Sequence, residues 1–489
     1  MAYLLGAATD GRDAKIETLP DELLLEIFDC HRMATLNDSA DTWKWHRLAH
    51  VCHRWRELVF TSPRRLDLRL VYTYKNPVRK NLDLWAAFPI SIWYPKSSQS
   101  RRLASEDEEN VLVALKHRDR ICEIDLPMTR QLASKSAGSM RSSFPALKRL
   151  HLRAPDTIRP LIIPNGFLGL SAPQLRDMHL SGIAFTTLPL LLRSTQALVS
   201  LQLDDIPNTG YISPGALATG LFGMGQLQTL RIHFLPPNSH ERSMDASPAS
   251  RVILPALTEF GFKGNCEYVE DLVSRIDAPA LEKISIMFFE QPTFGIPRLS
   301  RFICRTKELK SPHHMSIRLS EDDIVITHYS RRSFSDLGTF QLRIPCEEFD
   351  HQVPLLIHVG RHLSELLSGV ERFDIQAFPQ SLNGMEGEDV DSSVWLELFR
   401  PFRGVKKLEV TGGLVTCIAS ALQRATGEMA RIVLPALRDL HLLDSRSPVS
   451  EFIEPFVAAR QVYNRPVAVH YEREGSLDRQ SDDETRSVG

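Results

Sequence analysis

Short runs of alternating apolar and polar positions recur along the chain from residue 120 onward. A run opens on an apolar anchor, continues with two polar residues and then alternates, as in Leu147-x-x-Leu150-x-Leu152. This alternation predicts a short β-strand with one buried face. The other runs begin at Ile121, Leu175, Leu198, Leu227, Leu257, Leu281, Val370, Val405 and Leu437, with weaker copies at Pro312 and Leu337.

The spacing of these runs favours a repeat protein. It averages about 29 residues, and leucine-rich repeats carry one strand every ~20 to 29 residues. A Pro-Ala-Leu phrase precedes several runs, and helical stretches such as 267–275 and 414–424 lie between runs. Strands joined through helices at this spacing are expected to be parallel, with right-handed crossovers. The predicted fold class is therefore α/β: an irregular leucine-rich-repeat-like solenoid, or horseshoe, with parallel strands, which follows a short helical unit.

Residues 17–60 follow a helical pattern instead. Pro20 suits the first turn of a helix, and the acidic Asp21 and Glu22 favour its positive end. The apolar positions 23, 24, 27 and 28 then fall on one helical face. After a polar connection, a second stripe at helical spacing predicts one further helix; it contains Trp45, Leu48, Val51, Cys52, Trp55, Leu58 and Val59. So small a unit needs another surface to cover its apolar stripe, from this chain or from another protein.

The same residues carry a family resemblance. The segment LPDELLLEIF at 19–28, followed by LAHVCHRW at 48–55, resembles an F-box, and most closely the F-box proteins that fungi carry in large expanded sets. The resemblance implies that the helical unit docks onto a Skp-type adaptor and so delivers substrates to a cullin–RING ubiquitin ligase. The adaptor contacts that it implies are Leu19, Pro20, Leu23, Leu24, Ile27, Phe28, Leu48, Val51, Cys52 and Trp55.

Composition narrows the class of partner. With 58 Lys+Arg against 60 Asp+Glu, the net charge of −2 argues against a protein that wraps nucleic acid. No apolar run reaches the roughly 18 residues of a membrane span, and the N-terminus lacks the basic region of a signal peptide. The seven cysteines are scattered, which is typical of reduced thiols in the cytoplasm or nucleus.

The sequence offers no recognisable catalytic constellation, cofactor motif or metal site. Gly220, Gly223 and Gly225 cluster without the Gly-Lys-Ser/Thr ending of a phosphate-binding loop. His313 and His314 are adjacent, so their side chains would diverge on a regular element. We therefore expect a non-enzymatic protein; an enzyme hidden in residues 290–400, where the repeat is least clear, is the disfavoured alternative.

The predicted strands do offer a surface. Residues between the buried leucines should point to the open concave face, where mixed charges are suited to a protein partner, although they could also serve solubility alone. These candidate substrate contacts are Arg149, His151, Arg153, Asp177, His179, Gln202, Asp204, Arg231, His233, Lys263, Lys283, Lys407, Glu409, Asp439 and His441.

The expected organisation is a flexible N-terminus (1–15), an F-box (16–62), a connecting segment with the first solenoid strand (63–119), a solenoid (120–470) and a disordered tail (471–489). Polar stretches at 95–110, 134–143, 236–251 and 380–393 are predicted to be loops. The favoured function is a substrate receptor of a Skp–cullin–F-box ligase. The alternative is a solenoid scaffold that works without a ligase, its helical unit packed on its own first repeats.

Overall fold

A computed structural model describes most of the chain. The described residues are 18–35, 46–63, 70–72, 82, 88–94, 104–155, 160–236, 251–291, 294–306, 308–310, 312–329, 339–377, 392–443 and 449–472. The expected flexible N-terminus, the predicted loop segments 95–103, 237–250 and 380–391, and the expected tail beyond residue 472 lie outside these ranges. So do Trp45 of the second predicted helix and residues 64–69 of the connecting segment.

The helical unit contains three helices, α1 (Asp21–Thr35), α2 (His46–Ala49) and α3 (His53–Thr61). The prediction of a single second helix across 45–59 is therefore wrong, because two short helices, α2 and α3, occupy this range. Cys52 ends the helical path with an extended backbone (φ −155°, ψ 172°), and its Sγ accepts a hydrogen bond from the Trp55 N–H at 3.5 Å. Cys52 is thus the N-cap of α3, and this position separates the two short helices.

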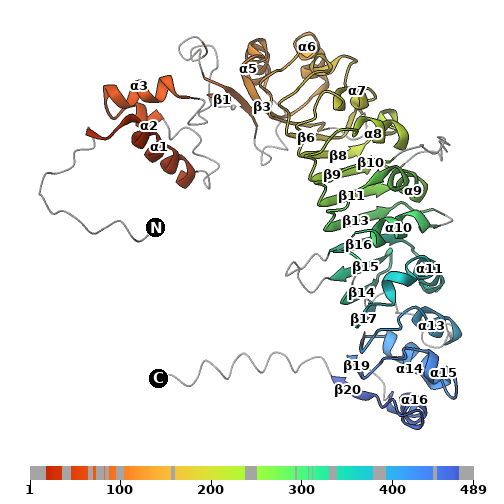
Figure 1. The fold of residues 1–489 in the computed structure, drawn as a ribbon. Helices are drawn as coiled ribbons and strands as arrows, with labels where there is room; N and C mark the ends of the chain where they lie inside the picture. The colour runs from red at the N-terminus through yellow and green to blue at the C-terminus, as the bar shows by residue number, and fades with distance from the viewer. Residues whose placement is uncertain are drawn as a thin grey trace, which may run out of the picture.

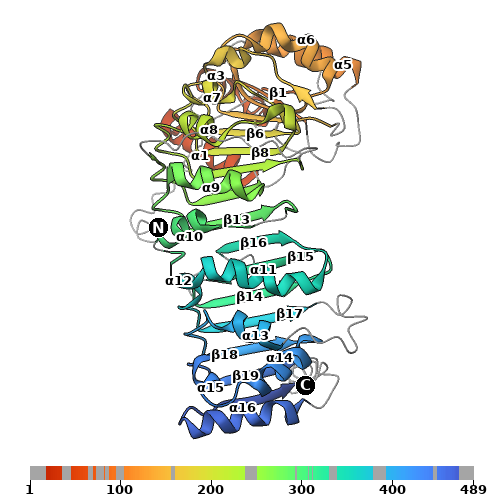
Figure 2. The ribbon, with the colours of Figure 1, turned by 90° about the vertical axis from the view of Figure 1, so that its right-hand side faces the viewer.

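The rest of the chain winds into one long sheet with helices along its outer side (Figures 1 and 2). The sixteen strands follow the spatial order β1-β2-β3-β4-β6-β8-β9-β11-β13-β16-β15-β14-β17-β18-β19-β20. Their bounds are β1 Leu70–Tyr72, β2 Ile90–Trp93, β3 Ile121–Pro127, β4 Arg149–Arg153, β6 Asp177–Ser181, β8 Ser200–Ile206, β9 Thr229–Phe234, β11 Glu259–Gly264, β13 Lys283–Phe288, β14 His314–Leu319, β15 Asp323–Tyr329, β16 Phe340–Pro345, β17 Arg372–Ala377, β18 Lys407–Thr411, β19 Asp439–Leu443 and β20 Ala468–Glu472.

The helices are short and follow the strands in turn. Their bounds are α5 Ser105–Ala114, α6 Arg130–Met140, α7 Leu188–Leu192, α8 Pro214–Gly220, α9 Cys266–Arg275, α10 Pro297–Cys304, α11 Phe349–His362, α12 Ser364–Leu367, α13 Ser392–Phe399, α14 Leu414–Arg424, α15 Met429–Ile432 and α16 Ser450–Val462, with 3-10 turns at Leu115–His117, Phe167–Leu170 and Asn208–Gly210. Two small pairs, β5 (Leu161–Ile162) with β7 (Ile183–Ala184) and β10 (Val252–Ile253) with β12 (Ile276–Asp277), lie beside the main sheet. The fold class is confirmed as an α/β solenoid, and the helices expected at 267–275 and 414–424 are present as α9 and α14.

The apolar positions of the repeat form the core between the sheet and the helices. On β4, for example, Leu150 and Leu152 are fully buried, while the residues that alternate with them are not. The recurrent Pro-Ala-Leu phrase closes one turn each time: the leucine N–H bonds the carbonyl three residues earlier, at 3.2 Å for Leu147 and 3.3 Å for Leu257. The phrase therefore places a buried leucine at the base of each strand that it precedes.

The parallel prediction is wrong at one place in the middle of the sheet. Strand β15 runs antiparallel to both β14 and β16, and β16 lies next to β13 while β14 pairs with β17. After β13 the chain leaves two strand positions empty and forms β14 in the third. It then returns through β15 and β16, which fill the two positions, and α11 leads across to β17. A short turn at Ser320–Asp323, in which the Ser320 N–H bonds the Asp323 carbonyl at 2.9 Å, joins β14 to β15. It leaves no room for the helical crossover that parallel neighbours need.

Two of the polar stretches predicted to be loops are partly helical. Within 134–143, α6 buries Leu132, Ser136 and Met140 on one face, and the Thr129 hydroxyl caps its first turn by accepting from Leu132 N–H at 3.1 Å. Within 95–110, α5 buries Glu108, whose carboxylate meets Lys135 at 2.9 Å. Polar residues that satisfy each other or the backbone allow a segment of low hydrophobicity to pack as a helix.

Candidate functional site

The predicted concave residues all lie on strands of the main sheet, at positions that alternate with buried apolar residues. The helices lie along the outer side of the arc (Figure 1), so side chains that alternate with the buried ones belong to the opposite, inner face of the sheet. This face is thus the row of side chains that the repeat pattern predicts. Its binding of a substrate stays a prediction.

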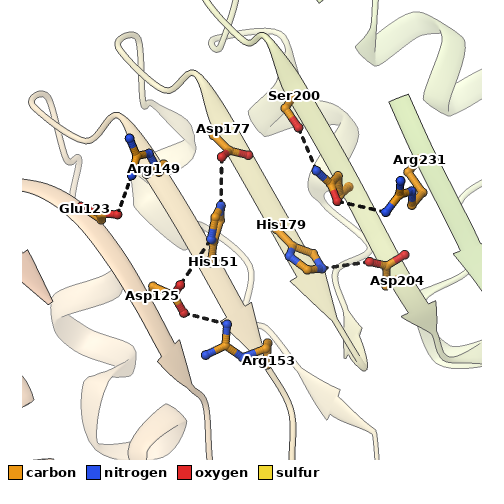
Figure 3. A network of polar contacts seen from close by, with 11 residues as sticks. Glu123, Asp125, Arg149, His151, Arg153, Asp177, His179, Ser200, Asp204 and Arg231 are labelled. Carbon is orange, nitrogen blue, oxygen red and sulfur yellow. Dashed lines mark hydrogen bonds and ion pairs between the residues drawn. The ribbon is translucent and has the colours of Figure 1, made fainter. Parts of the chain in front are cut away.

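At the N-terminal end of this face the charges pair with one another across the strands (Figure 3). Asp125 on β3 contacts Arg153 at 2.7 Å and His151 at 3.5 Å, and His151 also contacts Asp177 on β6 at 3.1 Å. Arg149 meets Glu123 at 2.9 Å. These contacts connect β3, β4 and β6 through side chains as well as through the backbone ladder.

The same arrangement continues onto the next strands. Asp204 on β8 lies between two histidines, at 2.9 Å from His179 and 2.8 Å from His233. Arg231 on β9 contacts Glu259 at 3.3 Å, and its Nη1 donates to Gln202 Oε1 at 3.4 Å. The predicted residues from 149 to 233 therefore all have partners on this face, in four paired groups that together form the concave network.

Burial opposes the charged states in this network, and the ion pairs outweigh it. Burial lowers the pKa of His151, but its hydrogen bonds to Asp125 and Asp177 raise that pKa to about 9. Burial raises the pKa of Asp204, but His179 and His233 more than offset it and hold this pKa well below its ordinary value. Burial also raises the pKa values of Asp125 and Asp177, but both end up lowered, chiefly because each carboxylate accepts a hydrogen bond from His151. The histidine at the centre is therefore charged at neutral pH.

A second paired group lies at the C-terminal end of the face. Glu409 on β18 contacts both Lys407 and Arg372 at 3.2 Å. His441 on β19 stacks on His470 of β20 with ring centroids 4.4 Å apart, and His470 lies 3.9 Å from Asp439. Here too the predicted residues neutralise each other.

Two predicted residues in the middle of the sheet differ from the rest. Lys263 on β11 is opposite Met287, and Lys283 on β13 is opposite Glu259, which already pairs with Arg231. Within the described part of the chain, neither lysine has a carboxylate at ion-pair distance. The centre of the concave face therefore carries unpaired positive charge between two neutralised ends.

The predicted adaptor residues of the helical unit divide into two groups. Leu24 and Phe28 on α1 and Leu48 on α2 are buried, with exposed fractions of 0%, 1% and 8%. Phe28 packs edge-on against the half-buried Trp55 with ring centroids 4.7 Å apart. This first group forms the core of the unit and holds the helices together, and its contact with an adaptor stays a prediction.

The second group points outward. Leu23 and Ile27 are 45% and 42% exposed and lie one helical turn apart on α1, and Val51 is 58% exposed. Pro20 and Cys52 are also exposed, and Leu19 is half-buried. Arg54 on α3 fixes this arrangement: its Nε donates to Asp21 Oδ1 at 3.0 Å and its Nη2 to the Leu19 carbonyl at 2.6 Å.

A different side of the unit faces the solenoid. Leu58 and Val59 of α3 are buried, and the Phe60 ring lies 5.8 Å from the Phe88 ring that precedes β2. Contact with the chain's own first strands thus occurs through the end of α3. It leaves the exposed residues of α1 uncovered.

Comparison with known proteins bears on this unit. Residues 16–69 match the family model described as F-box-like. The helical unit is an F-box-like domain. A search of curated proteins found no match to this chain. The likeness to the expanded fungal sets stays a prediction.

One similar solved structure is the leucine-rich repeat-containing protein LegL7 from Legionella pneumophila. It is 10% identical, with 79% of this chain and 97% of that chain covered, and the TM-score is 0.29. The fold described above therefore rests on the strands and helices of this chain itself. Nearly all of the described residues belong to the F-box-like domain or to the solenoid.

Sequence reasoning missed several members of the concave network. They are Glu123, Asp125, Glu259, Arg372, Asp374 and His470. All but His470 occupy the same alternating positions of a recognised repeat, so the repeat template could have identified them. His470 lies on β20, for which no run was recognised.

The described residues contain no group of three or more His, Cys, Asp or Glu side chains placed to hold a metal ion. All seven cysteines are free thiols. Among the helices described, none has the length and apolarity to cross a membrane. The region 290–400 does hold a buried titratable group, His328, whose pKa burial and nearby His314 lower to about 4. It lies on β15, and its Nδ1 is 3.0 Å from the hydroxyl of Thr339, the residue before β16.

Proposed function

We propose that the protein is a non-catalytic substrate receptor of a Skp–cullin–F-box ubiquitin ligase. The observation that carries the proposal is the division of the F-box-like domain into a closed core and an exposed apolar set. Burying exposed apolar side chains stabilises a complex by about 25 cal/mol per Å². Leu23 and Ile27, on one face of α1, are placed to contribute in this way to a Skp-type adaptor.

The position of the F-box-like domain favours the receptor over a self-contained scaffold. If the protein were a self-contained scaffold, the apolar stripe of the helical unit would be covered by the chain's own first repeats. Here the solenoid contact is made by Phe60 with Phe88, while Leu23, Ile27 and Val51 stay exposed. One side of the domain is therefore attached to the solenoid and another is free for an adaptor.

The concave face is the proposed substrate surface, and its central strands β11 and β13 are the proposed point of contact. Ion pairs already satisfied within the protein add little to binding, since a partner must first desolvate them. Lys263 and Lys283 carry no such pairing, so an acidic region of a substrate would gain most there. The receptor contributes proximity between substrate and ligase rather than chemistry. Its proposed location is the cytoplasm or the nucleus.

The adaptor contact is tested by co-purification. Full-length protein co-expressed with a Skp-type adaptor should retain it, and the double variant Leu23→Asp/Ile27→Asp should lose it. Leu190→Asp is the matched control, because Leu190 is 48% exposed on α7 of the solenoid; this variant should bind adaptor like the wild type. Adaptor retained by the double variant, or by a chain lacking residues 1–62, would refute the proposal and leave the scaffold as the better reading.

The substrate contact has its own assay. Partners captured by the wild-type chain should include proteins lost from the double variant Lys263→Glu/Lys283→Glu, which keeps the adaptor. Identical capture by both proteins would exclude the centre of the concave face as the binding surface.

A further inference from the structure

A cleft of about 480 Å³ lies at the C-terminal end of the solenoid, away from both proposed surfaces. Its lining residues come from the α13–β18 connection and from the segment that runs from α15 to β19. The lining residues are Arg400, Arg403, Met429, Arg431, Ile432 and Pro435. Three guanidinium groups thus share a cleft with three apolar side chains.

The three arginines have no acidic partner in the described chain. Arg400, Arg403 and Arg431 are exposed, and none of them forms an ion pair; Arg431 instead lies 5.6 Å from the centroid of the Tyr463 ring. Glu397, three residues before Arg400, pairs instead with Arg361 at 2.5 Å. Like charges that line one cleft repel one another unless an anion lies between them.

A fourth arginine lies buried behind the wall of the cleft. Arg460 of α16 is 1% exposed, and it donates to the carbonyls of Ala430 at 3.1 Å and Leu437 at 2.9 Å. Arg465 donates to the Pro435 carbonyl at 3.2 Å. No carboxylate of the described residues accompanies Arg460, so it fixes the 430–437 segment and adds its positive charge to the field in the cleft.

We propose that this cleft binds an acidic peptide segment of a partner protein, with an apolar side chain next to its carboxylates. Guanidinium groups match carboxylates in a planar, two-bond geometry, and the three arginines offer this to a short segment. Met429, Ile432 and Pro435 supply an apolar wall, and Ile432 is 48% exposed without a ligand. A polyanion such as nucleic acid gains nothing from that wall, which favours a peptide. The cleft belongs to the solenoid, so the proposal is independent of adaptor binding.

The probe is a phage-displayed random peptide library, selected on the full-length chain and counter-selected on the triple variant Arg400→Glu/Arg403→Glu/Arg431→Glu. Enriched peptides should carry Asp or Glu beside Leu, Ile, Met or Phe. A selected peptide, synthesised with a fluorescent label, should lose about tenfold or more in affinity on each single Arg→Glu change, as expected for charged hydrogen bonds. Its Asn/Gln counterpart should not bind.

Arg193→Glu is the matched control, because Arg193 is an exposed arginine at the end of α7 outside the cleft; it should leave the affinity unchanged. The variants should keep the wild-type melting temperature, since all three side chains are exposed. Selected peptides without acidic enrichment, equal binding by the triple variant, or duplex DNA bound with the same arginine dependence would overturn the proposal. No adaptor is present in this assay, so its outcome and that of the co-purification are separate.

Discussion

The stability of the solenoid should depend on pH through His151. This side chain connects Asp125 on β3 to Asp177 on β6, and it is 21% exposed. Its pKa is about 9 in the folded protein against an ordinary 6.5. A raised folded-state pKa means that the stabilisation is fully present below pH 6.5 and is lost as the pH rises through about 9.

The magnitude follows from the same two values. One pKa unit corresponds to about 1.36 kcal/mol, so the protonated His151 contributes up to about 3 kcal/mol to the free energy of unfolding. At the acid side, the pKa values of Asp125 and Asp177 are lowered from 3.8, so their contribution is lost as the pH falls through their folded-state values. The contribution of the cluster should therefore be largest between pH 3.8 and 6.5.

Urea unfolding of the wild type and of His151→Gln, measured from pH 6.5 to about 9, isolates the contribution of the charged His151 to the free energy of unfolding. Between pH 6.5 and about 9 the wild type should lose up to about 3 kcal/mol more than the variant. His351→Gln is the control, since His351 and its partner Glu348 are both 73% exposed and an exposed pair contributes about 0–1 kcal/mol. If wild type and His151→Gln change in parallel with pH, the charged state assigned to this histidine is refuted.

Two further substitutions test the packing. Phe28→Ala should weaken the F-box-like domain by about 3–5 kcal/mol because it empties a buried aromatic site. The control Leu23→Ala, at an exposed site, should change its stability by no more than about 0.5 kcal/mol. Hydrogen exchange across residues 18–63 measures both variants, and equal protection in the two would contradict the division into core and surface. Arg460→Met should cost about 3 kcal/mol of stability because it leaves buried carbonyls without donors. The control Arg465→Met, at an exposed site, should cost less than about 1 kcal/mol. Thermal unfolding distinguishes the two variants, and similar melting temperatures would show that Arg460 does not hold the 430–437 segment.

Most strands of the main sheet could be predicted from the sequence because one repeated pattern encodes them locally, whereas β2, β15 and β20 have no recognised run. Each recognised run, the weak ones at Pro312 and Leu337 included, is followed by a strand of the main sheet. The order of the strands in the middle could not be predicted in this way. The β14–β15–β16 excursion depends on a tight turn at Ser320–Asp323 and on which strand edges are open when the chain returns, and neither depends on apolar periodicity.

The site was predictable in composition but not in its internal pairing. Alternation alone places Arg149 and His151 on the concave face. Their partners Glu123 and Asp125 sit one strand away, in a register that only the assembled ladder defines. The same limit applies to α1, where helical spacing groups Leu23 with Leu24, although the assembled domain buries Leu24 completely and leaves Leu23 45% exposed.

The pairing changes how the near-zero net charge should be interpreted. A balanced composition suits a protein partner only if the charges are free to meet that partner, yet most concave charges are already neutralised by neighbouring strands. Displacing their partners would leave the buried Asp125 and the half-buried Asp204 without a compensating charge, at a cost of several kcal/mol. Recognition should therefore concentrate where positive charge is left over, at Lys263 and Lys283 on the inner face and at the arginine cleft near the C-terminus. Both positions favour acidic protein segments, whereas the paired side chains on the strands to either side of the two lysines connect neighbouring repeats.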